Sequence, residues 1–162
     1  MNLCMAKRIS GLLVFLCISY WVNAQAILPS SSIKRLQVVL TAEKYMGIRY
    51  RKKIDKMIFD CSGFVKYVLS QVDINVTRSS VTIVHDGKKV TPRTQARPGD
   101  IIVFKGRNHR NKRPGHVGLV HHVAGDTIHF IHSSTTRGVV MGHTYETYYA
   151  KRFLQVRDVI GD

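Results

Sequence analysis

The sequence predicts an α+β fold in which helices pack on one side of an antiparallel β-sheet. Two segments with helical periodicity come first, near residues 33–46 and 61–71. Apolar segments typical of strands follow from residue 101 onward, and two of them flank Ala124-Gly125-Asp126, a connection that suits an antiparallel hairpin. Helices followed by clustered strands are typical of this class. At 162 residues the chain is expected to hold one domain behind a leader.

The first 26 residues have the pattern of a secretory signal peptide. Lys7 and Arg8 precede an apolar segment over residues 11–22, which is shorter than the ~20 residues of a membrane-spanning helix. Ala24-Gln25-Ala26 then supplies small residues for cleavage after Ala24 or Ala26. We therefore expect a signal peptide over residues 1–26 and an exported domain over 27–162, located in the periplasm, the cell envelope or the medium.

The first predicted helix runs from Ile33 to Met46, with Ser32 as its N-cap and Gly47 at its end. We expect an apolar stripe of this helix to face the core: Ile33, Leu36, Val39, Leu40 and Tyr45. Residues 48–58 are basic around Tyr50 and are predicted to be irregular.

The second predicted helix begins at Cys61, with Asp60 as its N-cap, and runs to about Gln71. Residues 75–99 show no long element, although residues 81–84 fit a short helix or strand. A helical turn is expected within residues 144–150. The predicted strands are Ile101–Phe104, His116–Val123, Thr127–His132, Gly138–Met141 and Phe153–Ile160.

Cys61 is the one cysteine that remains once the leader, with Cys4 and Cys17, is removed. An unpaired cysteine in an exported protein indicates a reactive thiol or an intermolecular disulfide. The start of a helix carries partial positive charge, so this position predicts a lowered thiol pKa. A buried, inert cysteine is the alternative interpretation.

A thiolate nucleophile needs a nearby base, and the mature chain offers eight histidines. His116 opens one predicted strand and His132 ends the next, so antiparallel pairing can bring them together. Gly118, on the face of His116, is expected to let a helix pack closely. His121-His122 or His129-x-x-His132 resembles a metal-ligand spacing, but no HExxH or paired-cysteine pattern accompanies it, so we expect no metal.

Four motifs occur in the order Asp60-Cys61-Ser62-Gly63-Phe64-Val65, Pro98-Gly99-Asp100-Ile101-Ile102-Val103-Phe104, His116-Val117-Gly118-Leu119-Val120 and Phe130-Ile131-His132-Ser133-Ser134. In this order they resemble the NlpC-type family of cell-wall cysteine peptidases, over about residues 33–160. The resemblance implies a papain-like fold, in which the nucleophile begins a helix that packs on a small antiparallel sheet.

The resemblance also implies roles for individual residues. Cys61 matches the nucleophile, His116 the base and His132 the polar residue that orients the imidazole. The residues expected to bind substrate are Tyr50, Asp60, Ser62 and Arg78, with Asp60 and Ser62 recognising a free amine or capping the helix. Arg51-Lys52-Lys53 follows Tyr50 where relatives often have small residues, which changes the cleft there.

The activity implied is hydrolysis of an amide bond in peptidoglycan stem peptides, typically the bond between γ-D-glutamate and the diamino acid. Expected partners are peptidoglycan or its muropeptide fragments, and the net charge of +15 suits an anionic envelope polymer. Nucleic acid is disfavoured by export and by the lack of a binding motif. A monomer without a cofactor is expected. The alternatives are an amidase or acyl transferase on the same scaffold, or a non-catalytic wall-binding module.

Overall fold

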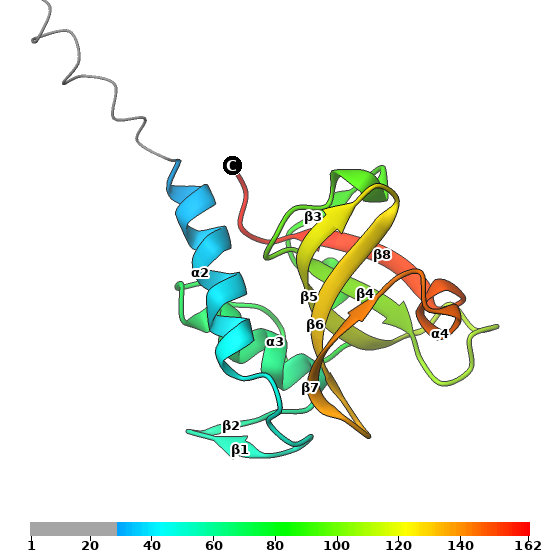
Figure 1. Ribbon diagram of the computed structural model, residues 1–162, viewed down its shortest axis with the longest axis horizontal. Coiled ribbons are helices and arrows are strands. Elements are labelled where there is room, and N and C mark those ends of the chain that lie inside the picture. Colours follow the sequence, from blue (N-terminus) through cyan, green and yellow to red (C-terminus); the bar gives the residue numbers. More distant parts are fainter. Residues whose placement is uncertain (1–28) are drawn as a thin grey trace, which may run out of the picture.

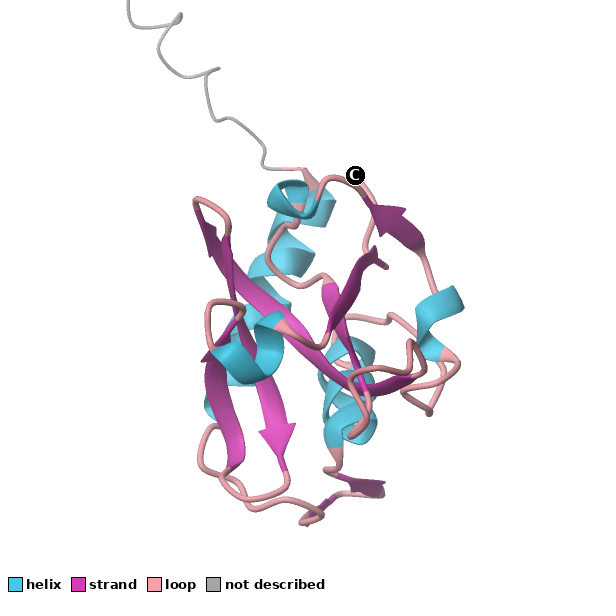
Figure 2. Ribbon diagram, turned by 90° about the vertical axis from the view of Figure 1, so that its right-hand side faces the viewer, coloured by secondary structure: helices cyan, strands magenta, loops and turns pink. Residues whose placement is uncertain are grey.

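Two helices lie on one face of a six-stranded antiparallel sheet in the computed structural model, which describes residues 29–162 (Figure 1). The strand order is β3-β8-β4-β5-β6-β7. A second sheet, β1-β2, lies apart from it at one end of the molecule (Figure 1, Figure 2). The predicted signal peptide, residues 1–26, lies outside the described residues. Within residues 29–162, no helix has the length and apolar character that a membrane crossing needs.

The elements follow the predicted order closely. The helices are α2 (Ser30–Lys44), α3 (Cys61–Ser70) and α4 (Thr147–Ala150), with 3₁₀ turns η1 (Ile83–His85) and η2 (Arg93–Gln95). The strands are β1 (Lys53–Ile54), β2 (Met57–Ile58), β3 (Lys88–Val90), β4 (Ile101–Lys105), β5 (Pro114–Ala124), β6 (Thr127–Ser134), β7 (Gly138–His143) and β8 (Phe153–Asp158). The α+β class is confirmed. The prediction of an irregular segment over residues 48–58 was wrong in part, because β1 and β2 form a short hairpin there.

The two faces of the sheet carry separate apolar clusters. On one face, Val117, Leu119 and Ile131 pack against α2 and α3 in the larger cluster. On the other face, Phe104 and Phe130 pack with Tyr149 of α4. Side chains along β5 and β6 therefore point alternately to the two faces of the sheet and contribute to both apolar clusters, one of which lies beneath α4.

The helix α2 buries a different face from the one that its apolar residues predicted. Ile33, Leu36 and Leu40 are about half exposed, at 45%, 56% and 47%, whereas Arg35, Val38 and Ala42 are buried. The predicted Ser32 cap was also wrong, because the helix begins at Ser30 after Pro29, without a side-chain cap.

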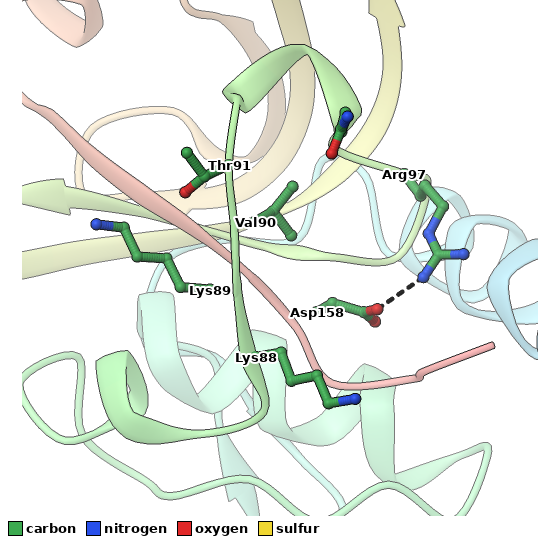
Figure 3. Close-up of a pocket in the computed structure, with 7 residues that line it drawn as sticks. Lys88, Lys89, Val90, Thr91, Arg97 and Asp158 are labelled. Atoms are coloured by element: carbon green, nitrogen blue, oxygen red, sulfur yellow. Dashed lines mark hydrogen bonds and ion pairs between the residues drawn. The ribbon is translucent and has the colours of Figure 1, made fainter.

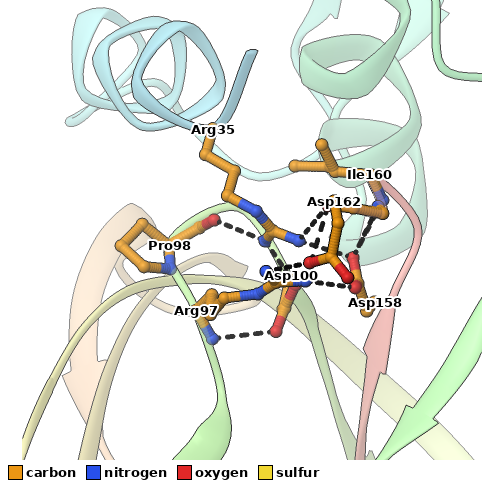
Figure 4. Close-up of polar contacts among 8 residues, drawn as sticks. Arg35, Arg97, Pro98, Asp100, Asp158, Ile160 and Asp162 are labelled. Carbon is orange, nitrogen blue, oxygen red and sulfur yellow. Dashed lines mark hydrogen bonds and ion pairs between the residues drawn. The ribbon is translucent and has the colours of Figure 1, made fainter. Parts of the chain in front are cut away.

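Arg35 accounts for this orientation. Its Nη1 donates to Oδ1 of Asp100 at 2.7 Å and its Nη2 donates to Oδ1 of Asp158 at 2.7 Å (Figure 4). Arg97 contacts the second oxygen of Asp158, also at 2.7 Å. Because Asp100 is fully buried, its carboxylate must be paired, and the arginine that pairs it turns α2 toward the sheet.

The two carboxylates respond differently to this network. Burial raises the pKa of Asp100, and the hydrogen bonds from Arg35 and the Arg97 amide only partly offset it. Burial also raises the pKa of Asp158, but the amides of Gly161 and Ile160, together with Arg35, outweigh burial and hold that pKa below its usual range. Asp158 is therefore the carboxylate that the network keeps ionised most firmly.

A pocket of about 380 Å³ lies beside this network, lined by β3, the segment that follows it and Asp158 at the end of β8 (Figure 3). Lys88, Lys89 and Thr91 line it together with Arg97 and Asp158. It shares no residue with the predicted site, so it is not part of the chemistry considered below.

The substitution Arg35→Leu should destabilise the fold by about 3–5 kcal/mol, because it leaves the buried Asp100 carboxylate without its cation. Urea unfolding followed by circular dichroism measures this free energy. Gln37→Leu, an exposed position on the same helix, is the matched control and should change stability by less than about 0.5 kcal/mol. Equal midpoints for the two variants would contradict the structural role of Arg35.

Candidate active site

Cys61 is the first residue of α3, and the turn before it is held tightly. The side chain of Asp60 accepts a hydrogen bond from the backbone N–H of Gly63 at 2.8 Å, so the predicted N-cap is confirmed. A Cβ atom on Gly63 would lie 1.9 Å from the carbonyl oxygen of Ile58. Glycine is therefore required for the segment before Cys61 to lie against the first turn of the helix.

Asp60, Ser62 and Arg78 form one polar cluster at this helix end. Arg78 Nη2 lies 2.8 Å from Oδ2 of Asp60, and its Nη1 donates to Ser62 Oγ at 2.8 Å. Burial raises the pKa of Asp60, but the hydrogen bonds from Arg78 and Gly63 outweigh it and the net pKa is lowered. Four of the five N–H donors of Arg78 are already used, by both carboxylate oxygens of Asp60, by Ser62 Oγ and by the carbonyl of Ile58. Arg78 and Asp60 thus form a closed ion pair at the start of the helix.

Tyr50 lies beside the same helix end. Its segment is attached to β7 by two backbone hydrogen bonds of 2.8 Å, from Gly47 to Val139 and from Val139 to Ile48. Burial raises the pKa of Tyr50, and the charges of Cys61 and Asp60 raise it further, which reflects how close these groups are. The structure thus gathers all four predicted substrate-binding residues around the start of α3.

His116 and His132 meet across β5 and β6. Nε2 of His116 lies 2.9 Å from Nδ1 of His132. Gly118 makes room for this approach, because a Cβ atom there would lie 3.0 Å from Cβ of His132. The expectation that Gly118 admits a helix was wrong: the space is filled by His132 and by Phe130.

The sulfur of Cys61 is placed at the start of β5. The backbone N–H of Val117, the residue after His116, lies close enough to the Cys61 sulfur to lower the pKa of the thiol. Ser133, the residue after His132, donates its hydroxyl to the carbonyl of Phe59 at 2.8 Å and so ties the segment before Cys61 to β6. These contacts bring the three predicted catalytic residues to one edge of the sheet, with Nδ1 as the ring nitrogen of His116 that His132 leaves open.

Burial disfavours the charged forms of Cys61, His116 and His132. It raises the pKa of Cys61, more than the amides of Val117 and Ser62 lower it. It lowers the pKa of His116 to about 4, and burial together with the charge of His116 lowers the pKa of His132 to about 3. The prediction that the helix end lowers the pKa of the thiol was therefore wrong, because burial keeps Cys61 as a thiol and both imidazoles neutral.

A pocket of about 670 Å³ opens beside the histidine pair. His116, His132 and Tyr149 line it, with Lys105 and Arg137 among the residues at its edge. The sequence analysis did not single out Tyr149, although its hydroxyl lies 3.0 Å from Nε2 of His132. Tyr145, Tyr148 and Tyr149 occur within five residues, and no pattern in the sequence separates the buried one from the other two.

The remaining histidines lie elsewhere. His122 stacks on His129 with ring centroids 4.2 Å apart, and His121 lies 2.7 Å from Glu43. Among residues 29–162, no group of three or more His, Cys, Asp or Glu side chains has the arrangement of a metal site.

The NlpC/P60 family model matches residues 44–158 of this chain. Murein DD-endopeptidase MepS/Murein LD-carboxypeptidase of Escherichia coli (strain K12) is 31% identical over 118 residues, which cover 72% of this chain and 58% of that protein. Gamma-DL-glutamyl hydrolase of Bacillus subtilis is 26% identical over 159 residues, covering 96% of this chain and 37% of that protein. The chain thus matches less than two thirds of the length of these relatives.

Solved structures are similar as well. The peptidoglycan hydrolase RipB from Mycobacterium tuberculosis superposes with a TM-score of 0.61 at 20% identity, covering 83% of this chain and 70% of that one. An NlpC/P60 family protein from Bacillus cereus superposes with a TM-score of 0.64 at 21% identity, covering 82% and 41%. These matches confirm the papain-like α+β fold. Because the family model matches most of the chain, this protein belongs to the NlpC/P60 family.

Proposed function

We propose that this chain is an exported cysteine endopeptidase that hydrolyses an amide bond in peptidoglycan stem peptides. Cys61 is the nucleophile, His116 the base and His132 the residue that orients the imidazole of His116. Family membership and the names of the relatives, which are murein and glutamyl hydrolases, support this activity.

The observation that carries the proposal is the 2.9 Å contact between the two histidines at the strand end that receives the Cys61 sulfur. A nucleophile, a base and a group that orients the base form the arrangement that acyl transfer needs. A module that only bound the wall would not need two hydrogen-bonded imidazoles at the start of the strand that lies beside Cys61.

The reaction follows from these positions. Nδ1 of His116 takes the thiol proton as the Cys61 sulfur attacks the amide carbon, and the carbonyl oxygen becomes an oxyanion. The backbone N–H of Cys61 is a donor for this oxyanion, and losing one such donor typically costs about 10²–10³ in rate. The imidazolium then protonates the leaving amine, which leaves a thioester. Water, deprotonated by His116, attacks the thioester and releases the acid and the free thiol.

The bond we propose is the one between γ-D-glutamate and the diamino acid. Gamma-DL-glutamyl hydrolase, which matches 96% of this chain, supports it by name. The relative from Escherichia coli is named for D,D- and L,D-cleavage, so a D,D-bond is the second candidate. We place the acyl side of either substrate beside the cluster of Asp60, Ser62 and Arg78, which lies at the start of α3 next to Cys61.

Export is part of the proposal, because the substrate lies outside the cytoplasm. The N-terminal signal pattern supports it, and the basic composition, with a net charge of +15, suits a carboxylate-rich polymer. We infer that peptidoglycan or its muropeptide fragments are the substrate, and that the domain acts as a monomer.

The substitution Cys61→Ala should abolish turnover of purified muropeptides, with a loss of about 10⁴–10⁶-fold, since the nucleophile is removed. Mass spectrometry of the products measures the loss and identifies the bond, because γ-D,L-cleavage frees the α-amine of the diamino acid and D,D-cleavage frees a D-alanine carboxylate. Ser70→Ala, on the exposed side of the same helix, is the matched control and should retain wild-type activity.

Identical product profiles for wild type and Cys61→Ala would rule out the enzyme. Turnover of simple amides or esters but not of muropeptides would favour an amidase or acyl transferase. Undiminished muropeptide binding by both proteins, with no product from either, would favour the wall-binding module.

The acid limb of kcat/KM should lie well below pH 6.5. The base is the neutral form of His116, and burial lowers the pKa of His116 to about 4, so this form persists as the pH falls toward that value. The free energy of unfolding, in contrast, decreases as the pH falls below about 6.5. The histidines of the unfolded chain take up protons in that range, whereas the buried ones do not, so protonation favours unfolding. Circular dichroism at each pH separates the two effects, and a limb near pH 6.5 in folded protein would contradict a buried neutral base.

A further inference from the structure

Both ring nitrogens of His132 are engaged, which a residue that only orients His116 would not require. Nδ1 lies 2.9 Å from Nε2 of His116, and Nε2 lies 3.0 Å from the hydroxyl of Tyr149. His132 is 1% exposed and Tyr149 is 6% exposed, so both contacts are shielded from solvent. The hydrogen-bonded series from His116 through His132 therefore extends one residue further, to Tyr149.

The position of the Tyr149 hydroxyl is fixed by apolar packing. Its ring centroid lies 5.2 Å from that of Phe104 and 5.0 Å from that of Phe130, both on the face of the sheet that α4 covers. The ring meets His132 edge to face, with centroids 5.4 Å apart. A rigid ring on a short helix thus holds one oxygen against one imidazole nitrogen.

The tautomers in this chain depend on one another. His116 can act as a base only if Nδ1 is unprotonated, so its proton must lie on Nε2 and be donated to Nδ1 of His132. Neutral His132 then carries its own proton on Nε2, and that proton needs an acceptor. The hydroxyl oxygen of Tyr149 is at the right distance to accept it.

The opposite tautomer disables the base. If Nδ1 of His132 carried the proton, it would donate to Nε2 of His116 and leave the His116 proton on Nδ1, facing the thiol. In that state Nε2 of His132 would instead accept the hydroxyl proton of Tyr149, so the direction of this 3.0 Å hydrogen bond distinguishes the two states.

The groups around these residues keep the phenol of Tyr149 neutral. The charge of Arg137 lowers the pKa of Tyr149, but burial, the larger effect, raises it. The other charged and titratable groups near Tyr149, His132 and Cys61 are His116, Glu146, Tyr148, Asp60, Tyr50 and Arg78.

We propose that Tyr149 is a positioning residue: its hydroxyl oxygen accepts the Nε2 proton of His132, which fixes the tautomers of both histidines and leaves Nδ1 of His116 free to take the Cys61 proton. This inference rests on the proposed function of the site, and its consequences reach the thiol even without a substrate.

The substitution Tyr149→Phe keeps the ring and removes only the acceptor. His132 then loses its preference for the tautomer with the proton on Nε2. The imidazolium of His116 is less stabilised as a result, so the Cys61 thiol gives up its proton less readily. We expect turnover to fall about tenfold to a hundredfold. We also expect the pH dependence of Cys61 alkylation to move up by about one pH unit.

Alkylation of the full chain by iodoacetamide, measured on the Cys61 peptide by mass spectrometry from pH 5 to 10, tests this without any substrate. Tyr145→Phe is the matched control, because Tyr145 is 83% exposed and lies four residues away. Superimposable curves for wild type and Tyr149→Phe, at equal melting temperature, would overturn the inference. A shifted curve for Tyr149→Phe, with Tyr145→Phe unchanged, supports it.

A second measurement uses the wild type and so does not depend on how the variant folds. The ¹⁵N chemical shifts of His132 report which ring nitrogen carries the proton. A proton on Nε2 supports the inference, and a proton on Nδ1 overturns it.

The two proposals can fail separately. If the wild type cleaves no muropeptide but its alkylation curve shifts in Tyr149→Phe, the proposed function fails and the role of Tyr149 stands. If the wild type cleaves muropeptides and Tyr149→Phe does so at the same rate and with the same alkylation curve, the function stands and the role of Tyr149 fails.

Discussion

The hydrogen bond between Nε2 of His116 and Nδ1 of His132 is the contact on which the geometry of the site depends. It needs two neighbouring antiparallel strands and a glycine opposite His132, because a Cβ atom at Gly118 would lie 3.0 Å from Cβ of His132. It also leaves Nδ1 as the ring nitrogen of His116 that His132 does not contact. The helix α3, the Ser133 contact to Phe59 and the packing beneath α4 then serve to bring other groups to this pair.

Local patterns were enough to predict much of this arrangement. Asp60 caps α3 as its position before an apolar periodic segment indicated, and the hairpin of β5 and β6 turns at Gly125 as the Gly-Asp pair indicated. These features depend on residues a few positions apart, for which side-chain spacing and turn chemistry carry the information. The meeting of His116 and His132 follows from the same hairpin once its register is known.

Long-range pairs were not predictable in the same way. The buried face of α2 is set by Arg35, whose partners Asp100 and Asp158 lie 65 and 123 positions along the chain. The exposed apolar residues Ile33, Leu36 and Leu40 lie on the opposite side of α2 from the buried residues. Apolar periodicity alone therefore selected the wrong face. Tyr149 was missed for a related reason, since only the fold shows that one of three nearby tyrosines reaches Nε2 of His132.

Burial explains why proton positions matter so much at this site. A thiol whose pKa is raised and imidazoles whose pKa values are lowered do not exchange a proton spontaneously, so Cys61 stays uncharged. In the proposed reaction, charge separation therefore accompanies attack on the substrate, where the helix-end amides stabilise the developing oxyanion. A base in such a site must already present an open nitrogen, and the proposed hydrogen bond between His132 and Tyr149 would provide that orientation before the substrate binds.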